Sequence, residues 1–341
     1  MTPPTPSAPV TPQRLMQMAW GFAIPLVLEA AVKHRVFDVL DERPRTLDEI
    51  VSATGASRRG LRAILNTLVS VELLGKDGDR YKLTAESAAL LVSGKPGFQG
   101  AFLRNISTYL LPNWLGLSKV VATGKPADRV NQEGSGSEFF TQLVEDIYPM
   151  SAGAAAILAD HLFASLTQPA SVLDLATGSG VWGIAAAKRS PHVTVTAVDW
   201  PTVIPITQRV TGKHGVGDRF RYAPGDLLEV DFGTGHRLAT LGHILHSEGE
   251  ERSRKLLAKT FKALAPGGTI AIAEFVPNDD RCGPPGPLIF AVNMLINTDI
   301  GDTYTFSEIS SWLREAGFEN ARQLPAPGPS PLILADRPGR S

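Results

Sequence analysis

Cysteine is nearly absent from this sequence of 341 residues, with Cys282 as its single example. An intrachain disulfide is therefore impossible, and we expect a reducing, cytoplasmic compartment. The formal net charge is only -1, which removes the electrostatic basis for binding nucleic acid or an anionic membrane. The apolar segment from Ala19 to Val32 is too short to cross a bilayer and contains Pro25 and Glu29. We expect no nucleic acid and no membrane as partners.

The overall composition is that of a globular protein. Hydrophobic residues make up 43% of the sequence and charged residues 20%, and the length allows two domains. Residues 1–12 are rich in Thr, Pro and Ser without apolar periodicity, which predicts a disordered tail.

Residues 13–95 carry the pattern of a small helical domain that ends in a hairpin. Thr46 and Glu49 form a capping-box pattern at a helix start, and Asp77-Gly78 predicts the turn of a hairpin after a second helix. This order of elements predicts a winged helix. Basic and acidic residues are equal in number between Thr46 and Val92, so we favour a dimerisation module over a DNA-binding regulator. Residues 96–165 predict a helical connector that contributes to an acceptor pocket.

Residues 166–337 alternate between strand and helix patterns. Strands are predicted at 171–175, 193–198, 219–223, 237–242 and 268–275, with amphipathic helices between them. Two short apolar runs end the segment, near 322–324 and at 331–335. Only a Pro/Gly turn separates them, so they must pair antiparallel. We predict an α/β fold with a Rossmann-like sheet of seven strands, mostly parallel with an antiparallel last strand, behind a mainly α N-terminal domain.

A glycine turn marks the first βαβ unit of this sheet. The strand that contains Asp174 leads into Gly178-x-Gly180-x-x-Gly183, and the next strand ends at Asp199. Glycines let the backbone adopt positive φ and approach a ligand, while an acid at the second strand end can bind ribose hydroxyls. Both a dinucleotide and S-adenosylmethionine fit this pattern. An NAD-dependent oxidoreductase therefore stays open on the motif alone.

Further motifs in the same order give a resemblance. They are Val198-Asp199-Trp200-Pro201, Gly225-Asp226-Leu227, Ile244-Leu245-His246 and the run from Ala263 to Glu274. Together with the glycine turn, they resemble the class I S-adenosylmethionine-dependent methyltransferases. More narrowly, the chain is similar to small-molecule O-methyltransferases with an N-terminal winged-helix dimerisation domain, the plant-phenol and acetylserotonin type. The resemblance implies a homodimer formed through that domain.

The resemblance also implies roles for individual residues toward the donor. Asp174, Gly178 and Gly180 would hold its methionine part, and Asp199 its ribose, with Trp200 beside the adenosine. The adenine would lie against Gly225, Asp226 and Leu227, with the Asp226 carboxylate accepting from its amine. His243 would contact the donor or the acceptor.

His246 is the residue that we expect to carry the chemistry. A phenol has a pKa near ~10, and a histidine near ~6.5 is a suitable general base for it. Glu274 matches an acid of the family, whereas Ser247-Glu248 replace the usual Asp-Trp, and Thr303 stands where a second acid is usual. Asp302 is a possible substitute for that acid. These departures leave C-methylation, or a donor-binding enzyme of other chemistry, as alternatives.

The acceptor is expected to be a small aromatic or secondary-metabolite molecule. By the resemblance, the residues that would face it lie on two helices: Tyr148, Met150, Phe290, Asn293, Met294 and Asn297. No Cys/His cluster is evident along the sequence, so we predict no metal.

Overall fold

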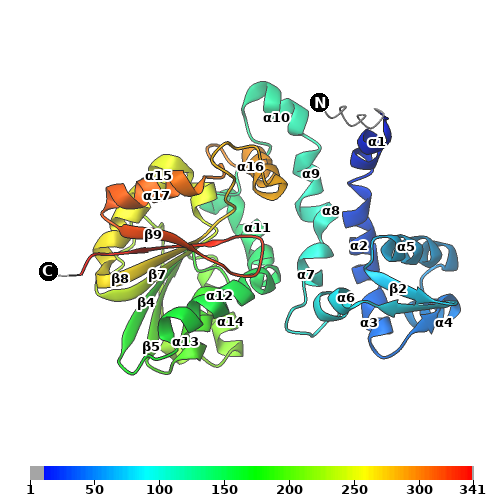
Figure 1. The fold of residues 1–341 in the computed structure, drawn as a ribbon, viewed down its shortest axis with the longest axis horizontal. Helices are drawn as coiled ribbons and strands as arrows, with labels where there is room; N and C mark the ends of the chain where they lie inside the picture. Colours follow the sequence, from blue (N-terminus) through cyan, green and yellow to red (C-terminus); the bar gives the residue numbers. More distant parts are fainter. Residues whose placement is uncertain (1–10, 340–341) are drawn as a thin grey trace, which may run out of the picture. The chain divides into compact units, whose positions relative to one another are not determined.

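The computed structural model describes residues 11–339, and the chain divides into two compact units, Met1–Leu110 and Leu111–Ser341 (Figure 1). Residues 1–10 of the predicted disordered tail lie outside the described residues. The segment predicted as a connector is shared between the units, since residues 96–110 belong to unit 1 and residues 111–165 to unit 2.

Unit 1 consists of short helices and a small antiparallel sheet with strand order β1-β3-β2. Its core is formed by leucines of α5 together with Phe37, Ile50 and Tyr81. The helices are α1 (Gln13–Ala19), α2 (Ala23–Lys33), α3 (Val36–Asp41), α4 (Leu47–Thr54), α5 (Arg58–Ser70), α6 (Ala85–Leu90), α7 (Gly100–Leu103) and α8 (Ile106–Tyr109). The strands are β1 (Arg45–Thr46), β2 (Leu74–Asp77) and β3 (Arg80–Leu83).

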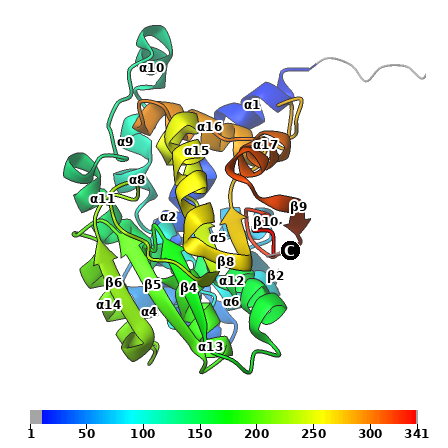
Figure 2. The same ribbon diagram turned by 90° about the vertical axis from the view of Figure 1, so that its left-hand side faces the viewer.

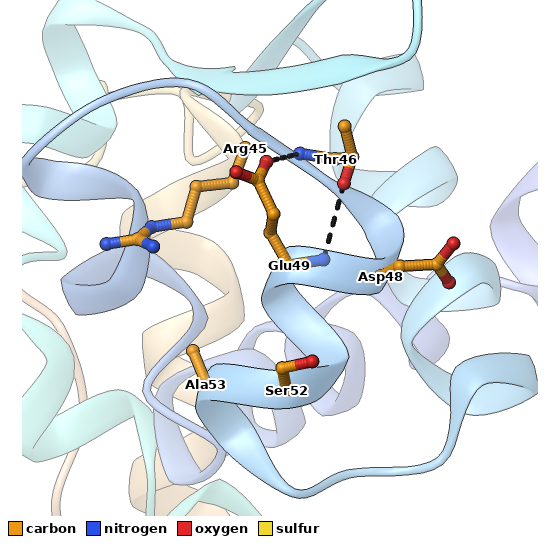
Figure 3. Close-up of a pocket in the computed structure, with 6 residues that line it drawn as sticks. All are labelled: Arg45, Thr46, Asp48, Glu49, Ser52 and Ala53. Carbon is orange, nitrogen blue, oxygen red and sulfur yellow. Dashed lines mark hydrogen bonds between the residues drawn. The ribbon is translucent and has the colours of Figure 1, made fainter.

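The capping box predicted at the start of α4 is confirmed. The Thr46 hydroxyl accepts from the Glu49 N–H (3.3 Å), and the Glu49 carboxylate accepts from the Thr46 N–H (2.7 Å), as Figure 3 shows. The bond from the Thr46 N–H, aided by the neighbouring Arg43, lowers the pKa of Glu49 to about 2. The surrounding open pocket of unit 1 contains none of the predicted site residues. Of its polar groups, Thr46 and Glu49 cap the helix start, whereas Arg45 pairs with Glu42 and Asp48 with Arg58.

The first two helices expose an apolar surface. Among the described residues, the span Gln13–Lys33 alone has the length and hydropathy of a membrane-crossing helix, with mean hydropathy 1.6 and 11% of it buried. The chain breaks between α1 and α2 at Trp20, and Pro25 lies in the first turn of α2, where its missing N–H costs no helical bond. The apolar side chains that are more than half exposed are Leu15, Met16, Met18, Trp20 and Phe22.

Unit 2 is built on a sheet of seven strands with order β6-β5-β4-β7-β8-β10-β9. β10 is antiparallel to both β8 and β9, whereas the other pairs are parallel, which confirms the predicted fold class. The strands are β4 (Ala170–Leu175), β5 (Val193–Asp199), β6 (Phe220–Pro224), β7 (His236–Gly242), β8 (Leu264–Ala273), β9 (Glu319–Leu324) and β10 (Leu332–Asp336).

Helices cover both faces of this sheet (Figures 1 and 2). α12, α13 and α14 pack on one face, and α15 and α17 on the other, each over its own apolar core. Burial on both faces explains the continuous apolar runs of the parallel strands. The helices of unit 2 are α9 (Leu111–Trp114), α10 (Leu117–Thr123), α11 (Glu133–Asp146), α12 (Tyr148–Phe163), α13 (Val181–Arg189), α14 (Ile204–Lys213), α15 (Leu245–Ala263), α16 (Pro285–Asn297) and α17 (Phe306–Ala316), with a 3-10 turn at Gly217–Arg219.

Candidate active site

Asp174 lies beneath the glycine turn. Its carboxylate is fully buried and accepts from the Thr177 hydroxyl (2.8 Å), the Gly183 N–H (3.0 Å) and the Thr240 hydroxyl (2.7 Å). Burial raises the pKa of Asp174 to about 6, although these three bonds oppose the rise. The role predicted for Asp174 toward the donor's methionine part stays a prediction. The acid is 0% exposed, and it fixes the turn to the sheet.

Asp199 occupies the end of β5 and joins the turn to the next loop. Its carboxylate accepts from the Gly178 N–H and from the Trp200 N–H, both at 2.7 Å. Burial, with a smaller contribution from the Asp174 charge, raises the pKa of Asp199 to about 6. Gly178 and Gly180 have φ of 52° and 80°, which a residue with a Cβ rarely adopts. The structure thus brings together the predicted residues of the turn and the ribose acid.

The loop after β6 lies beside this acid. The Gly225 N–H donates to the Asp199 carbonyl (2.9 Å), and the Leu227 side chain is buried in the core. The Asp226 carboxylate accepts from the Leu228 N–H (2.8 Å) and forms an ion pair with Arg252 (2.8 Å). The Asp226 carboxylate at this edge of the sheet is therefore already paired with Arg252. The pairing with Arg252, on α15, is not apparent from the sequence motifs.

Trp182 also lies near the turn, and the sequence analysis missed it. Its indole nitrogen would be only 2.0 Å from a Cβ built on Gly242, at the end of β7. Gly242 therefore leaves the space that the indole occupies. In the sequence, only the glycine immediately before His243 could have indicated that a bulky side chain packs there.

These residues fit the nucleoside part of a donor molecule. Asp199 is an acceptor-only group at the carboxyl edge of a parallel sheet, where such folds bind ligands. Its anchoring bonds come from backbone groups, and each carboxylate oxygen keeps a further lone pair for a ribose hydroxyl. The Trp200 ring is held edge-on against Phe140, with the ring centres 5.8 Å apart.

His246 and Glu274 form a buried pair on the other side of the same edge. The His246 Nδ1 lies 2.8 Å from a Glu274 oxygen, and the His246 N–H donates to the other oxygen (3.2 Å). The two residues are only 9% and 2% exposed. Burial raises the pKa of Glu274, but the neighbouring His246 and His243 outweigh it and leave the pKa lowered. An ionised Glu274 holds the proton of His246 on Nδ1 and leaves the Nε2 lone pair free.

His243 lies three residues before His246, in the bend between β7 and α15, with a left-handed backbone conformation and φ of 61°. Its Nδ1 is buried and has no hydrogen-bond partner in the described part of the chain. Burial lowers the pKa of His243 to about 4, so the ring is neutral at neutral pH. Folding brings one donor atom each of His243, His246 and Glu274 within 4.8 Å of one another, a cluster of metal-ligating groups that the sequence analysis did not anticipate.

Aromatic rings pack around the His246 ring. Phe290, on α16, meets the His246 ring edge-on at 4.9 Å and stacks on Phe275 at 3.9 Å. Phe290 is thus close to His246, and its role toward the acceptor stays a prediction. Met294 is buried, at 5% exposure, on the same helix.

The two asparagines predicted to face the acceptor also hold α16 in place. Asn293 accepts from the Trp114 indole N–H (3.1 Å). Asn297 accepts from the Asn113 side chain (2.7 Å) and donates to the Asn293 carbonyl (2.9 Å). The acceptor role of this pair stays a prediction, and their amide groups already bond α9 to α16.

Tyr148 and Met150, predicted to face the acceptor from the central helix, have other neighbours in the structure. The Tyr148 ring stacks on His214, which follows α14, with the ring centres 5.1 Å apart, and burial raises the pKa of Tyr148. The Met150 carbonyl lies beside Gly328, in the loop between β9 and β10. In the described part of the chain, neither side chain is bonded to His246 or Glu274. The Tyr148 ring packs against His214.

Asp302 does not replace the missing second acid. Its carboxylate lies 3.7 Å from Arg281 and accepts from the Thr303 N–H (2.7 Å), while only its backbone N–H reaches the His246 carbonyl (2.9 Å). The Thr303 hydroxyl is buried without a partner among the described residues. Of Asp302 and Glu274, only Glu274 has a carboxylate bonded to the His246 ring.

The fold and this edge together define an α/β protein whose sheet edge fits a nucleoside and carries a buried pair of His246 and Glu274. Two family models match the chain: the O-methyltransferase dimerisation domain over residues 16–93 and the O-methyltransferase domain over residues 131–319. The chain belongs to the O-methyltransferase family. This assignment confirms the resemblance and sets the oxidoreductase and DNA-binding alternatives aside.

Individual relatives span most of the chain. It is 29% identical to 3-hydroxy-5-methyl-1-naphthoate 3-O-methyltransferase of Streptomyces sahachiroi, over 96% of each chain. It is 24% identical to L-tyrosine C(3)-methyltransferase of Streptomyces lavendulae, over 98% of this chain and 95% of the relative. A solved structure of PigF with S-adenosylhomocysteine has a TM-score of 0.79 and 25% identity, covering 96% of this chain and 100% of that one.

Proposed function

We propose that this enzyme transfers a methyl group from S-adenosylmethionine to a hydroxyl of a small aromatic acceptor, with His246 as the general base. The observation that carries the proposal is the buried pair of His246 and Glu274, joined at 2.8 Å. The family assignment supports the reaction class, and the relative that acts on a hydroxynaphthoate supports the aromatic acceptor.

S-Adenosylmethionine supplies a methyl group on a positively charged sulfur that is already activated for transfer. The protein therefore has to bind, position and deprotonate. Asp199 and the turn at Gly178 would hold the ribose side, with Trp200 next to the adenosine. His246 would take the acceptor proton on Nε2, and the ionised Glu274 would stabilise the resulting imidazolium. Phe275 and Phe290 would exclude water from this step.

Methylation at carbon is the second candidate. The relative named as a C-methyltransferase of L-tyrosine supports it. Deprotonation of a phenol also increases the nucleophilicity of its ring carbons, so the same histidine would serve both outcomes.

A single series of experiments tests the proposal. Wild-type protein should bind S-adenosylhomocysteine and not NADH in calorimetry. With an acceptor identified by screening hydroxylated aromatics, His246→Ala should lower turnover about 10²–10⁴-fold and leave S-adenosylhomocysteine affinity nearly unchanged. The matched control is His192→Ala, at an exposed site. Equal turnover of the His246 variant and the control would remove the base role.

The exposed apolar surface of α1 and the start of α2 supports a homodimer formed through unit 1. Its residues fall largely within the span matched by the dimerisation domain model. Burying side chains such as Leu15 and Trp20 against a second copy would remove them from water. Leu15→Glu combined with Trp20→Glu should shift the sedimentation coefficient from dimer to monomer. A double variant that stays dimeric would exclude this surface as the interface.

A further inference from the structure

His243 lies beside the proposed active site, but the proposed reaction gives it no role. Its Nδ1 is buried and unpartnered, although buried polar groups nearly always have one. The ring packs against Phe275, with the centres 5.2 Å apart, and tilts toward His246 at 6.4 Å. The orphaned nitrogen therefore lies beside the catalytic pair.

We propose that His243, His246 and Glu274 bind one divalent transition-metal ion, and that this ion switches the general base off. The proposal rests on the base role of His246 given above. Two imidazoles and one carboxylate suit Zn²⁺, Ni²⁺ or Co²⁺. One donor atom of each residue lies within 4.8 Å of the other two.

The distances require only a small adjustment. Ligand bonds to Zn²⁺ are about 2.0–2.2 Å long, so two donors at tetrahedral angles around one ion lie about 3.3–3.6 Å apart. The His246 Nδ1 and the Glu274 oxygen, now 2.8 Å apart, would separate by about half an ångström to admit the ion. The donor atoms all lie within 4.8 Å of one another, so the widest pair would approach by about 1.3 Å. The buried His243 Nδ1, which has no partner among the described residues, is available as a donor.

Binding changes the position of one proton on His246. In the metal-free pair, Nδ1 carries the proton that is shared with Glu274, and Nε2 has the free lone pair. When the metal bonds to the Nδ1 lone pair, the neutral ring keeps its single proton on Nε2. The Glu274 carboxylate changes from hydrogen-bond acceptor to metal ligand, and no electron is transferred. A base whose lone pair is protonated cannot accept the acceptor's proton.

Direct titration of the wild-type protein is the first test. Full-length protein without a polyhistidine tag, freed of metal with a chelator, is titrated with ZnCl₂ by calorimetry. We expect one ion per chain, and with Co²⁺ a visible absorption band of nitrogen and oxygen ligation. Absence of Zn²⁺ binding, which would mean that the orphaned nitrogen has only water as a partner, overturns the proposal.

His243→Phe tests the new ligand, because the aromatic ring preserves the packing on Phe275. Loss of a residue that hydrogen-bonds a metal ligand typically weakens metal binding about 10–100-fold. Loss of a direct ligand should weaken Zn²⁺ binding by at least as much. His192→Phe, at an exposed site, is the control and should bind like wild type. Retained S-adenosylhomocysteine binding shows that the His243→Phe variant is folded. If this variant does not fold, the His243→Ala variant is used in its place. Equal affinity of variant and control overturns the assignment.

Nitrogen NMR of the histidine rings separates this proposal from the proposed function. Addition of Zn²⁺ should move the His246 proton from Nδ1 to Nε2, while S-adenosylhomocysteine affinity changes less than about twofold. An unchanged His246 tautomer overturns the switch, even if His246→Ala still abolishes turnover and so keeps the base role. If His246→Ala retains turnover while the wild-type protein binds Zn²⁺, the ion site stands. Only the proposed effect of the ion on catalysis is then excluded.

Discussion

The two halves of the site are assembled in different ways. The centre of the donor half comes from a single βαβ unit, in which the Asp174 carboxylate accepts from the Gly183 N–H and the Asp199 carboxylate from the Gly178 N–H. The base half combines His246 of α15, Glu274 after β8 and Phe290 of α16. A local motif therefore fixes the donor half, whereas the base half depends on the packing of elements distant in the sequence. Changes in the two halves should consequently affect different quantities.

Glu274→Gln should give the largest effect and confine it to the base half. The amide removes the negative charge that faces His246 and cannot hold the ring in one orientation as the carboxylate does. We expect kcat to fall about 10²-fold, with the affinity for S-adenosylhomocysteine unchanged. Single-turnover rates and calorimetry on the same samples measure both. A loss of donor affinity with normal kcat would show that the halves are not separate.

Asp199→Asn should do the opposite. Charge-assisted bonds to the ribose are each worth about 1.5–3 kcal/mol, so affinity should fall at least about tenfold. The wild-type affinity should also weaken as pH falls from 7 to 5, because the folded pKa of about 6 means that the acid gains a proton in that range. The variant, which has no such proton to gain, should give a flatter profile. Parallel pH slopes would assign the titration to another group, with Asp174 the first to examine.

Gly242→Ala tests the close packing between Gly242, at the end of β7, and the Trp182 ring. The added Cβ would lie 2.0 Å from the indole nitrogen, so the ring must move. Overpacking of this kind costs about 1–3 kcal/mol in the free energy of unfolding. Gly212→Ala, in α14 with no atom within 4 Å of the new Cβ, is the matched control and should stabilise by roughly 0.5–1 kcal/mol. If both variants behave alike, close packing at Gly242 is unimportant.

The same contrast explains what the sequence could predict. The turn glycines, Asp199 and the sheet follow from local spacing and strand periodicity, and the resemblance supplied His246 and Glu274. Trp182 and Arg252 were missed because their partners lie on other strands and helices, which no spacing records. The stacking of Tyr148 on His214 was not predicted for a related reason: a helical pattern does not show which neighbour a ring meets.

Asn293→Ala should have the smallest effect and decides between recognition and support on α16. The amide of Asn293 accepts from the Trp114 indole and from the Asn297 side chain, so its loss leaves the partly buried indole N–H without this partner. Unfolding in urea should show a loss of about 1–2 kcal/mol. The affinity for S-adenosylhomocysteine should stay constant, since the donor half does not depend on α16. A raised KM for the acceptor without any loss of stability would support the recognition role, and would mean that the base half also reads its acceptor through this helix.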